Sequence, residues 1–117
     1  MVVDELDSDA VDRVFHGLAD ATRRDIVVQV LHQEQSISAL ARRYDMSFAA
    51  VQKHVAVLER ATLVTKQRRG REQLVHGNPD ILHKVARLLD EYEQIWRHRA
   101  RAIDDILSED RKKETDR

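Results

Sequence analysis

The sequence has no cysteine, only one proline and only three glycines among its 117 residues. Without cysteine it can form neither disulfides nor thiolate metal sites, which fits a reducing compartment, and we expect a cytoplasmic protein. So few glycines and prolines leave little room for a turn-rich β-protein, so helix should dominate. Aromatic residues make up 4% of the chain, and the core must therefore be built mainly from aliphatic side chains.

Long apolar runs are also missing, because none approaches the ~20 residues that a membrane-spanning helix needs. The N-terminus carries Asp4 and Glu5 where a secretory signal would be basic, so no leader is expected. The length suits a single domain over residues 1–117. Within it we expect acidic residues 1–8 and charged residues 108–117 to be flexible tails.

The net charge of −1 hides a strong local bias. Between residues 42 and 71 the acidic residues are Asp45 and Glu59, and the eight basic ones are Arg42, Arg43, Lys53, Arg60, Lys66, Arg68, Arg69 and Arg71. This stretch therefore carries +6 and the remainder of the chain −7. Because phosphate binding depends on the local field, the stretch is a candidate nucleic-acid surface although the whole chain is slightly acidic.

Residues 47–60, within this basic stretch, are predicted to form a two-faced helix. Val51, Val55 and Leu58 recur at spacings of four and three, so they form one apolar stripe that can face a core. Ser47 stands where an N-cap would be. The opposite face is small or hydrogen-bonding, with Ala49, Gln52 and Lys53, and His54 lies beside it. Such a face suits a DNA major groove, although any amphipathic surface helix also turns polar groups outward.

The flanking segments decide between these two interpretations. A short helix over 36–44, capped by Ser36 or Ser38, is followed by the turn Asp45-Met46, which is helix-turn-helix spacing. Two earlier helices are expected, one capped by Ser8 or Asp9 and running to about Leu18, the other capped by Asp20. Gln33-Glu34-Gln35 is interpreted as a polar break between helices.

After Arg60 the pattern changes from helix to β-hairpin. Residues 63–68 and 72–76 are β-prone, and Arg69-Gly70-Arg71 is a turn between them. Directly after a helix-turn-helix, a hairpin with a basic tip is typical of a wing that reaches phosphates or an adjacent minor groove. The alternative is a solvated hairpin whose charges only protect its edges.

A long helix is predicted over 79–107, where Asn78 serves as N-cap and Pro79 occupies the first turn. Its apolar seam has heptad spacing and is interrupted only by Arg99; its other members are Leu82, Val85, Leu89, Tyr92, Trp96, Ile103 and Ile106. Such a helix spans ~45 Å. Packing on its own domain can explain the first half of the seam but not the part from Trp96 to Leu107. We therefore expect residues 79–107 to be a dimerisation helix.

Three stretches in this order resemble the ArsR family of bacterial winged-helix repressors. Residues 18–27 are similar to the family's Leu-Ala/Ser-Asp signature, with Ala21 in place of the usual Pro. Residues 47–58 are similar to its recognition helix, Ser-x-x-x-Val-Ser-x-His-Leu-x-x-Leu. Residues 61–64 match its Ala-Gly-Leu-Val turn, with Thr62 in place of Gly. Together the matching stretches lie within residues ~14–76.

The resemblance implies a mainly α fold with a small β-hairpin wing, that is, a winged helix-turn-helix with a long C-terminal dimerisation helix. It implies a homodimeric transcriptional repressor, with double-stranded DNA and a second copy of itself as partners. The residues expected at DNA are Ser47, Phe48, Ala49, Ala50, Gln52, Lys53 and His54, then Arg42, Arg43, Lys66, Arg68, Arg69 and Arg71. Those expected at the dimer interface are Val11, Val14, Phe15, Leu82, Val85, Leu89, Tyr92, Trp96 and Ile103.

The chain also departs from the family's metal sensors. It has no cysteine for an arsenic or cadmium site. The zinc sensors carry Asp-x-His and a later His pair on the terminal helix, whereas Asp80 and His83 are three apart here and nothing after His98 completes a second pair. Because zinc needs about four well-placed ligands, we expect a metal-independent member with no cofactor.

Several of the predicted site residues have two possible roles. Gln52 can pair with an adenine edge or face solvent, and Lys53 suits a phosphate better than a base. His54 can touch phosphate or pack beneath its helix. Phe48 can contact a thymine methyl or simply be exposed, and Arg42 and Arg43 can bind the DNA backbone or only solvate their helix. Trp96 suits a dimer-interface anchor better than a ligand pocket.

Three functions compete. The leading prediction is a repressor that reads a palindromic operator through residues 47–60 and a wing over 63–76, with half-sites ~34–36 Å apart. A metal- or ligand-responsive sensor is possible within that function. The second is a dimerisation or adaptor module whose winged helix contacts protein. An enzyme is not expected, because the sequence has no Gly-rich phosphate loop, no Ser/His/Asp order and no cluster of metal ligands.

Overall fold

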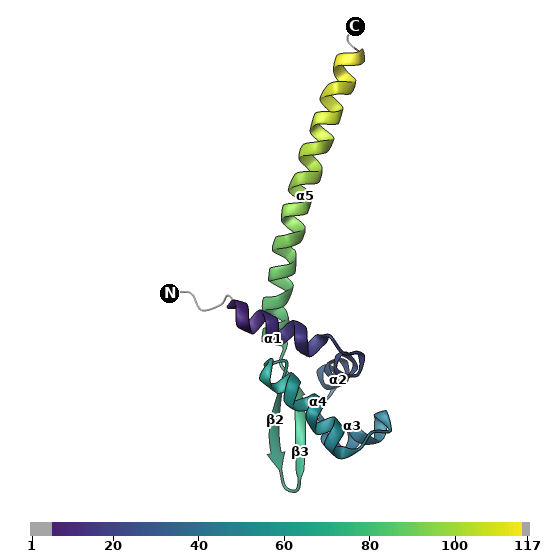
Figure 1. Cartoon of the computed structure of the whole chain (residues 1–117), viewed down its shortest axis with the longest axis vertical. Coiled ribbons are helices and arrows are strands. Elements are labelled where there is room, and N and C mark those ends of the chain that lie inside the picture. The colour runs from purple at the N-terminus through teal and green to yellow at the C-terminus, as the bar shows by residue number, and fades with distance from the viewer. Residues whose placement is uncertain (1–5, 116–117) are drawn as a thin grey trace. The chain divides into compact units, whose positions relative to one another are not determined.

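The computed structural model describes residues 6–115 and is mainly helical with one small sheet (Figure 1). The elements are α1 (Ser8–Leu18), α2 (Ala21–His32), β1 (Gln35–Ser36), α3 (Ile37–Tyr44), α4 (Phe48–Arg60), β2 (Val64–Arg69), β3 (Glu72–Gly77) and α5 (Pro79–Thr115). They form two compact units, and the second unit begins at Ala86 within α5. The predicted fold class is confirmed.

Side-chain caps set the starts of the short helices. The carboxylate of Asp20 accepts a hydrogen bond from the backbone N–H of Arg23 at 3.0 Å, which begins α2. Ser36 and Ser47 cap α3 and α4 in the same way. The first helix differs from the prediction, because Asp7 rather than Ser8 or Asp9 is its N-cap. Of the N-terminal tail expected over 1–8, residues 1–5 lie outside the described residues, and Asp7 and Ser8 belong to the start of α1.

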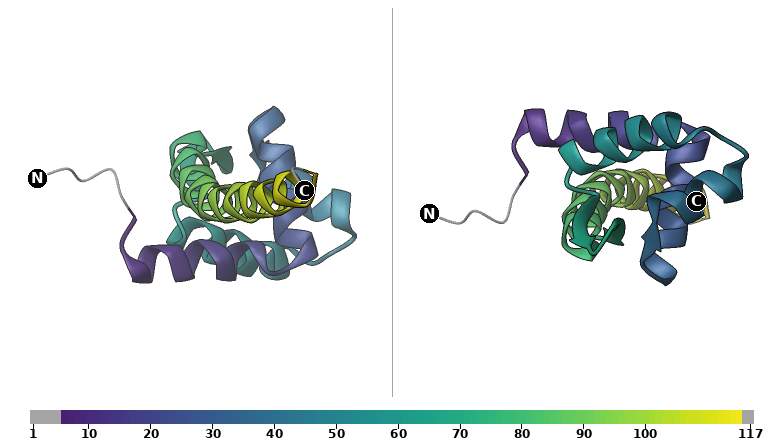
Figure 2. Two further views of the ribbon diagram at one scale, coloured as in Figure 1. Left: turned by 90° about the horizontal axis from the view of Figure 1, so that it is seen from above. Right: turned by 90° about the horizontal axis from the view of Figure 1, so that it is seen from below.

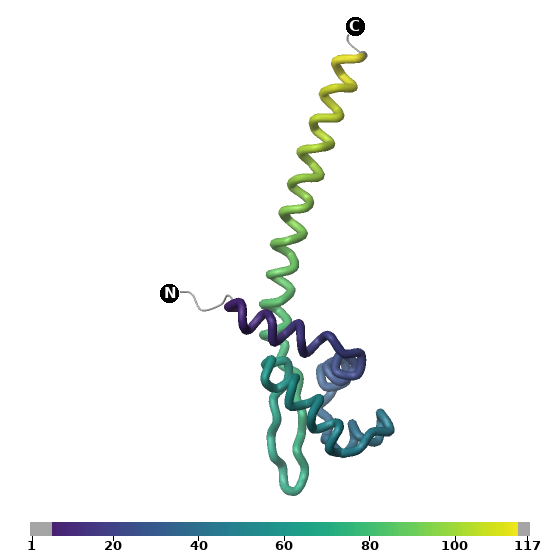
Figure 3. Tube along the Cα trace, in the orientation of Figure 1, coloured from purple at the N-terminus to yellow at the C-terminus, as the bar shows by residue number. Residues whose placement is uncertain are grey.

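The core of the first unit is aliphatic, as the composition requires. Val51, Val55 and Leu58, the stripe predicted on the helix over 47–60, have no exposed surface. They pack with side chains from every other helix of the unit and from the sheet, among them Val14, Ile26, Ile37, Leu63 and Val75. The chain path through this unit can be followed in Figure 3, and both views of Figure 2 show α1 beside α4. Burial of its inner stripe fixes which face of α4 points outward.

The sheet has three antiparallel strands in the order β1-β3-β2. The predicted hairpin is confirmed, with Arg69 opposite Glu72 and Val64 opposite Gly77. Its two-residue turn places Gly70 at φ +62°, where a residue without Cβ is favoured. Strand β1 was not expected, because Gln35 was assigned to a polar break. It forms because Gln35 and Ser36 pair with Val75 and Leu74 of β3.

Thr62 adopts a left-handed backbone with φ +60° between α4 and the wing. A β-branched residue is an outlier in this region, and a glycine would occupy it without strain. The family pattern has Gly at this position. The substitution noted in the sequence therefore falls on a position where the backbone itself favours glycine.

Helix α5 continues past the predicted end at Leu107 to Thr115. The expected tail over 108–117 is therefore wrong for residues 108–115, and residues 116–117 lie outside the described residues. The helix exposes a row of large apolar side chains: Leu89, Tyr92, Ile95, Trp96, Ile103, Ile106 and Leu107. Within residues 6–115, no helix is both long enough and apolar enough to cross a membrane.

Candidate nucleic-acid interface

Helices α3 and α4 form the helix-turn-helix of the first unit. The turn between them is tight because Asp45 ends α3 in a left-handed conformation with φ 51°. Ser47 then caps α4, its hydroxyl accepting a hydrogen bond from the N–H of Ala50 at 3.1 Å. This cap fixes the first turn of α4, which carries the predicted DNA-facing residues. The Ser47 hydroxyl thus already has a structural role.

The outer face of α4 is open along its first two turns. Phe48, Ala49, Gln52 and Lys53 are exposed, whereas Ala50 is half-buried. Among the described residues, neither Gln52 nor Lys53 has a side-chain hydrogen bond or ion pair within the chain. Their polar groups are therefore free to meet an external partner.

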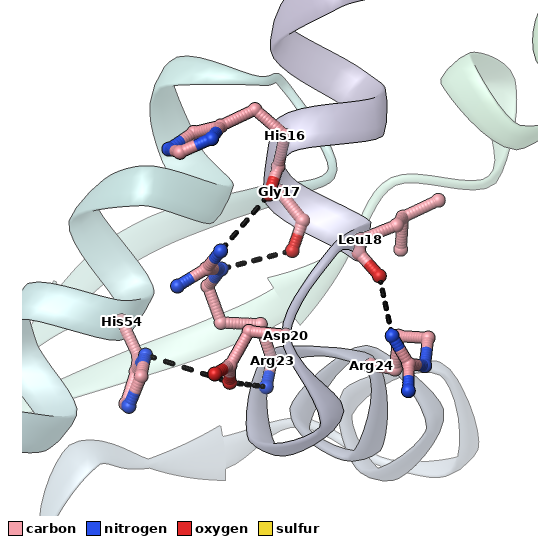
Figure 4. A network of polar contacts seen from close by, with 7 residues as sticks. All are labelled: His16, Gly17, Leu18, Asp20, Arg23, Arg24 and His54. Atoms are coloured by element: carbon pink, nitrogen blue, oxygen red, sulfur yellow. Dashed lines mark hydrogen bonds and ion pairs between the residues drawn. The ribbon is translucent and has the colours of Figure 1, made fainter.

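The side chain of His54 points toward Asp20 (Figure 4). Its Nδ1 lies 4.0 Å from Oδ2 of Asp20, the cap of α2, and the imidazole is largely covered. The backbone N–H of Arg23 lowers the pKa of Asp20, which favours the charged carboxylate beside the ring. The ring of His54 therefore lies against the cap of α2, and a contact between His54 and phosphate stays a prediction.

Arg23 joins the same corner of the fold. Its guanidinium donates hydrogen bonds to the backbone carbonyls of Gly17 and His16, each at 2.9 Å. These carbonyls belong to the end of α1, where intrahelical donors run out. Arg24 donates likewise to Leu18 O at 2.8 Å. Figure 4 shows how these contacts and His54 bring α1, α2 and α4 together.

Arg43 on α3 is engaged inside the protein. Its Nε lies 3.5 Å from Oδ2 of Asp25, and its guanidinium carbon lies 5.8 Å from the centre of the Tyr44 ring. The hydroxyl of Tyr44 donates to the same carboxylate at 2.5 Å, which lowers the pKa of Asp25. Burial and the Asp25 carboxylate raise the pKa of Tyr44 to about 12. Arg42, in contrast, is exposed and makes no ion pair with any described residue.

The four basic residues of the wing divide into two pairs. Lys66 Nζ lies 3.4 Å from Glu59 Oε1 of α4, and Arg69 Nη1 lies 3.5 Å from Oε1 of Glu34. Within residues 6–115, Arg68 and Arg71 meet no carboxylate; Arg68 only donates to the carbonyl of Gly70 at 3.3 Å. Arg68 and Arg71 are thus the wing cations that can bind a phosphate without breaking an internal ion pair.

The residues predicted at a dimer interface fall into three groups. Val14 and Val85 are core residues of the first unit, 0% and 6% exposed, so little or none of either side chain is open to a partner. Val11 and Leu82 are half-buried. The remaining five are exposed: Phe15, Leu89, Tyr92, Trp96 and Ile103.

Over residues 6–115, His, Asp and Glu nowhere gather in a group of three or more that could hold a metal ion. Sequence reasoning also missed the acidic side chains that meet the basic ones. Asp20 and Asp25 lie on or before α2, and Glu34 follows that helix. Only the folded arrangement brings them close to His54, Arg43 and Arg69, and no local sequence pattern predicts these pairings.

A helix-turn-helix packed on the core by its inner face, an outward-facing second helix and a basic hairpin define the chain as a winged helix-turn-helix transcriptional regulator. No protein-family model matches the chain. It is 35% identical over 81 residues to the HTH-type transcriptional regulator Rv2034 of Mycobacterium tuberculosis, covering 69% of this chain and 76% of that protein.

A solved ArsR-like transcriptional regulator from Rhodococcus sp. RHA1 is 33% identical, with a TM-score of 0.77 over 86% of this chain and 92% of that chain. The chain therefore belongs to the ArsR family. The winged helix-turn-helix DNA-binding domain of Mb0332 from Mycobacterium bovis, described as homodimeric, has a TM-score of 0.61 at 23% identity. It covers 77% of this chain and 84% of its own. At that identity the likeness shows the fold alone.

Proposed function

We propose that the protein is a homodimeric repressor that binds a palindromic DNA operator through α4 and the wing. The observation that carries this proposal is the coincidence of the +6 stretch over 42–71 with the helix-turn-helix and hairpin. Among residues 6–115, the cations Lys53 of α4 and Arg68 and Arg71 of the wing form no internal ion pair. Uncompensated cations on one surface are what phosphate binding requires.

The proposed contacts follow from exposure and from the lack of ion pairs within the described part of the chain. Gln52 reads a base edge, because its amide can pair bidentately with adenine, and Phe48 and Ala49 make close apolar contacts in the groove. Lys53 and Arg42 bind phosphates on either side of the groove. Arg68 and Arg71 reach the backbone or minor groove beside it. Ser47, Ala50 and His54 hold α4 in position.

The proposed dimer is supported by the exposed apolar row on α5. Trp96 is 61% exposed and Ile95 69%, on a helix that also exposes Leu89 and Tyr92. Rows of this size are uncommon on a monomer and mark interaction sites. The homodimeric state described for Mb0332 is consistent with a second copy as the occupant. Two protomers would then read half-sites about 34–36 Å apart.

The test is a fluorescence-anisotropy titration of labelled DNA from upstream of the protein's own coding region, beside a scrambled duplex of equal length. Tight binding to the native duplex alone, weakening with salt and indifferent to a chelator, is the expected result. Binding that needs metal would instead identify a metal-responsive sensor. Absence of binding to either duplex would favour the adaptor function, in which the winged helix contacts protein.

A further inference from the structure

Glu34 stands between α2 and β1 and touches both long strands of the wing. Its Oε1 lies 3.5 Å from Nη1 of Arg69 on β2, and its Oε2 lies 3.2 Å from Nδ1 of His76 on β3. Each carboxylate oxygen thus serves a different strand. No other acidic side chain among the described residues makes ion pairs with both strands of the hairpin.

The contact to His76 extends a very short strand pairing. Strand β1 has only two residues, Gln35 opposite Val75 and Ser36 opposite Leu74. Continuing this antiparallel register by one residue places Glu34 beside His76. The carboxylate–imidazole pair therefore adds a side-chain contact at the position next to the two backbone-paired positions of β1 and β3.

His76 depends on this contact for its orientation. Its Nε2 is buried and has no hydrogen-bond partner among the described residues, so Glu34 supplies the one polar contact of the ring. Both protonation states of imidazole can place a proton on Nδ1 and donate it to a carboxylate. His76 also lies opposite Thr65 of β2, near the base of the wing. A ring held at this position restrains the hairpin close to where it leaves the core.

We infer that Glu34 is a positioning residue that orients the wing. Arg69 then holds β2 in place through its ion pair with Glu34 and does not serve as a phosphate ligand. Lys66, paired with Glu59 of α4, restrains the other side of β2. Arg68 and Arg71 are then presented to the DNA backbone in a fixed direction. The DNA part of this inference rests on the proposed function; the orientation of the wing does not.

A matched pair of variants separates orientation from charge. Glu34→Gln keeps the shape of the side chain but replaces one acceptor by an amide N–H₂ that repels a donor. Glu72→Gln makes the same change on the wing itself. Glu72 faces Arg69 across the turn, is exposed, and forms no ion pair with any residue in the described part of the chain.

The first readout needs no DNA. Residual dipolar couplings of the β2 and β3 amides report the direction of the wing relative to α4 within the first unit. We expect Glu34→Gln to change the wing couplings while those of α4 stay, and Glu72→Gln to change neither. Unaltered wing couplings in Glu34→Gln would overturn the inference even if the wild-type protein bound no DNA and the proposed function failed.

The second readout is the salt dependence of DNA affinity. A misdirected wing loses phosphate contacts, so Glu34→Gln should weaken binding by up to about fivefold, the upper end for an exposed ion pair. The slope of log affinity against log salt should become shallower by about 1 to 2. If both variants tighten binding alike, Glu34 acts only as a negative charge. If Glu34→Gln alone tightens binding and steepens the slope, Glu34 withholds Arg69 from DNA; either result contradicts a positioning role.

Discussion

Nδ1 of His54 on α4 lies 4.0 Å from Oδ2 of Asp20, the residue that caps α2. The helix proposed to read DNA is thereby braced against the corner where α1 meets α2. The same carboxylate accepts the backbone N–H of Arg23, so one side chain serves both the cap and the brace. A histidine on this helix thus has a role inside the protein.

We predict that His54→Ala weakens binding to native and scrambled duplexes by the same factor and lowers Tm slightly. The side chain faces Asp20, so its loss loosens α4 without removing a base contact. Anisotropy titrations with both duplexes, together with thermal unfolding, give the three quantities. A selective loss on the native duplex would instead assign His54 a reading role.

Gln52 and Lys53 are neighbours on the outer face of α4 and should behave differently. Gln52→Ala should cost about 1–3 kcal/mol of binding free energy on the native duplex and little on the scrambled one, because it removes a base contact. Lys53→Ala should weaken both and reduce the salt slope by about 1, because it removes a phosphate contact. Titrations at two or more salt concentrations measure both effects. Equal losses for Gln52→Ala on the two duplexes would refute its role as a reader.

Trp96→Arg should shift the protein from dimer to monomer, because it puts a charge into the middle of the exposed apolar row of α5. A central aromatic anchor contributes about 2 kcal/mol or more to association. Analytical ultracentrifugation over a concentration series measures the change. Gln94→Arg, two residues away and therefore on a different face of the helix, is the matched control. An unchanged dimer in Trp96→Arg would place the interface elsewhere.

Tyr44→Phe should destabilise the protein at neutral pH by about 1 kcal/mol, because it removes a hydrogen bond to the carboxylate of Asp25. The pKa of Asp25 is lowered, so its contribution to stability is present above its ordinary value near ~3.9 and is lost as the pH falls through the folded-state pKa.

The pKa of Tyr44 is raised to about 12, so its contribution is complete below its ordinary value near ~10 and is lost as the pH rises through about 12. The difference in Tm between wild type and Tyr44→Phe should therefore be widest near neutral pH and narrow toward both extremes. Thermal melts across the pH range test this, and a pH-independent difference would contradict it.

Thr62→Gly should stabilise the protein by about 1 kcal/mol. A residue with a Cβ is strained in the left-handed backbone conformation found at Thr62, whereas glycine adopts it without strain. Thr62→Ala is the matched control. Both variants lose the bond from Thr62 Oγ1 to the carbonyl of Ala61, but Ala retains the Cβ and its strain. Urea unfolding of the three proteins gives the comparison, and equal effects of Gly and Ala would show that strain at Thr62 is not the cause.

Periodic and local features of the fold could be predicted from the amino-acid sequence alone. The stripe of Val51, Val55 and Leu58 is buried as predicted, because helical periodicity leaves only one face for a core. Asp20 and Ser47 cap their helices as predicted. An N-cap hydrogen bond joins a side chain to a backbone N–H only three positions further along the chain, so it depends on local sequence alone. The hairpin around Gly70 followed from β-prone residues on both sides of a turn former.

The partners of the long polar side chains depend on how distant segments pack. Arg43, Lys66 and Arg69 carry the same charge as Arg42, Arg68 and Arg71, yet only the first three meet a carboxylate in the described part of the chain. Their partners lie 7 to 35 positions away along the chain, so no local pattern can distinguish the two sets.

Burial on α1 and α5 was likewise decided by the fold. Val14 and Phe15 are adjacent apolar residues, but Val14 is in the core and Phe15 is 41% exposed. Strand β1 exists only because β3 offers it a free edge, and its two residues have no strand pattern of their own. Periodicity shows that a helix has an apolar face, whereas which part of that face its own domain covers depends on how distant segments pack.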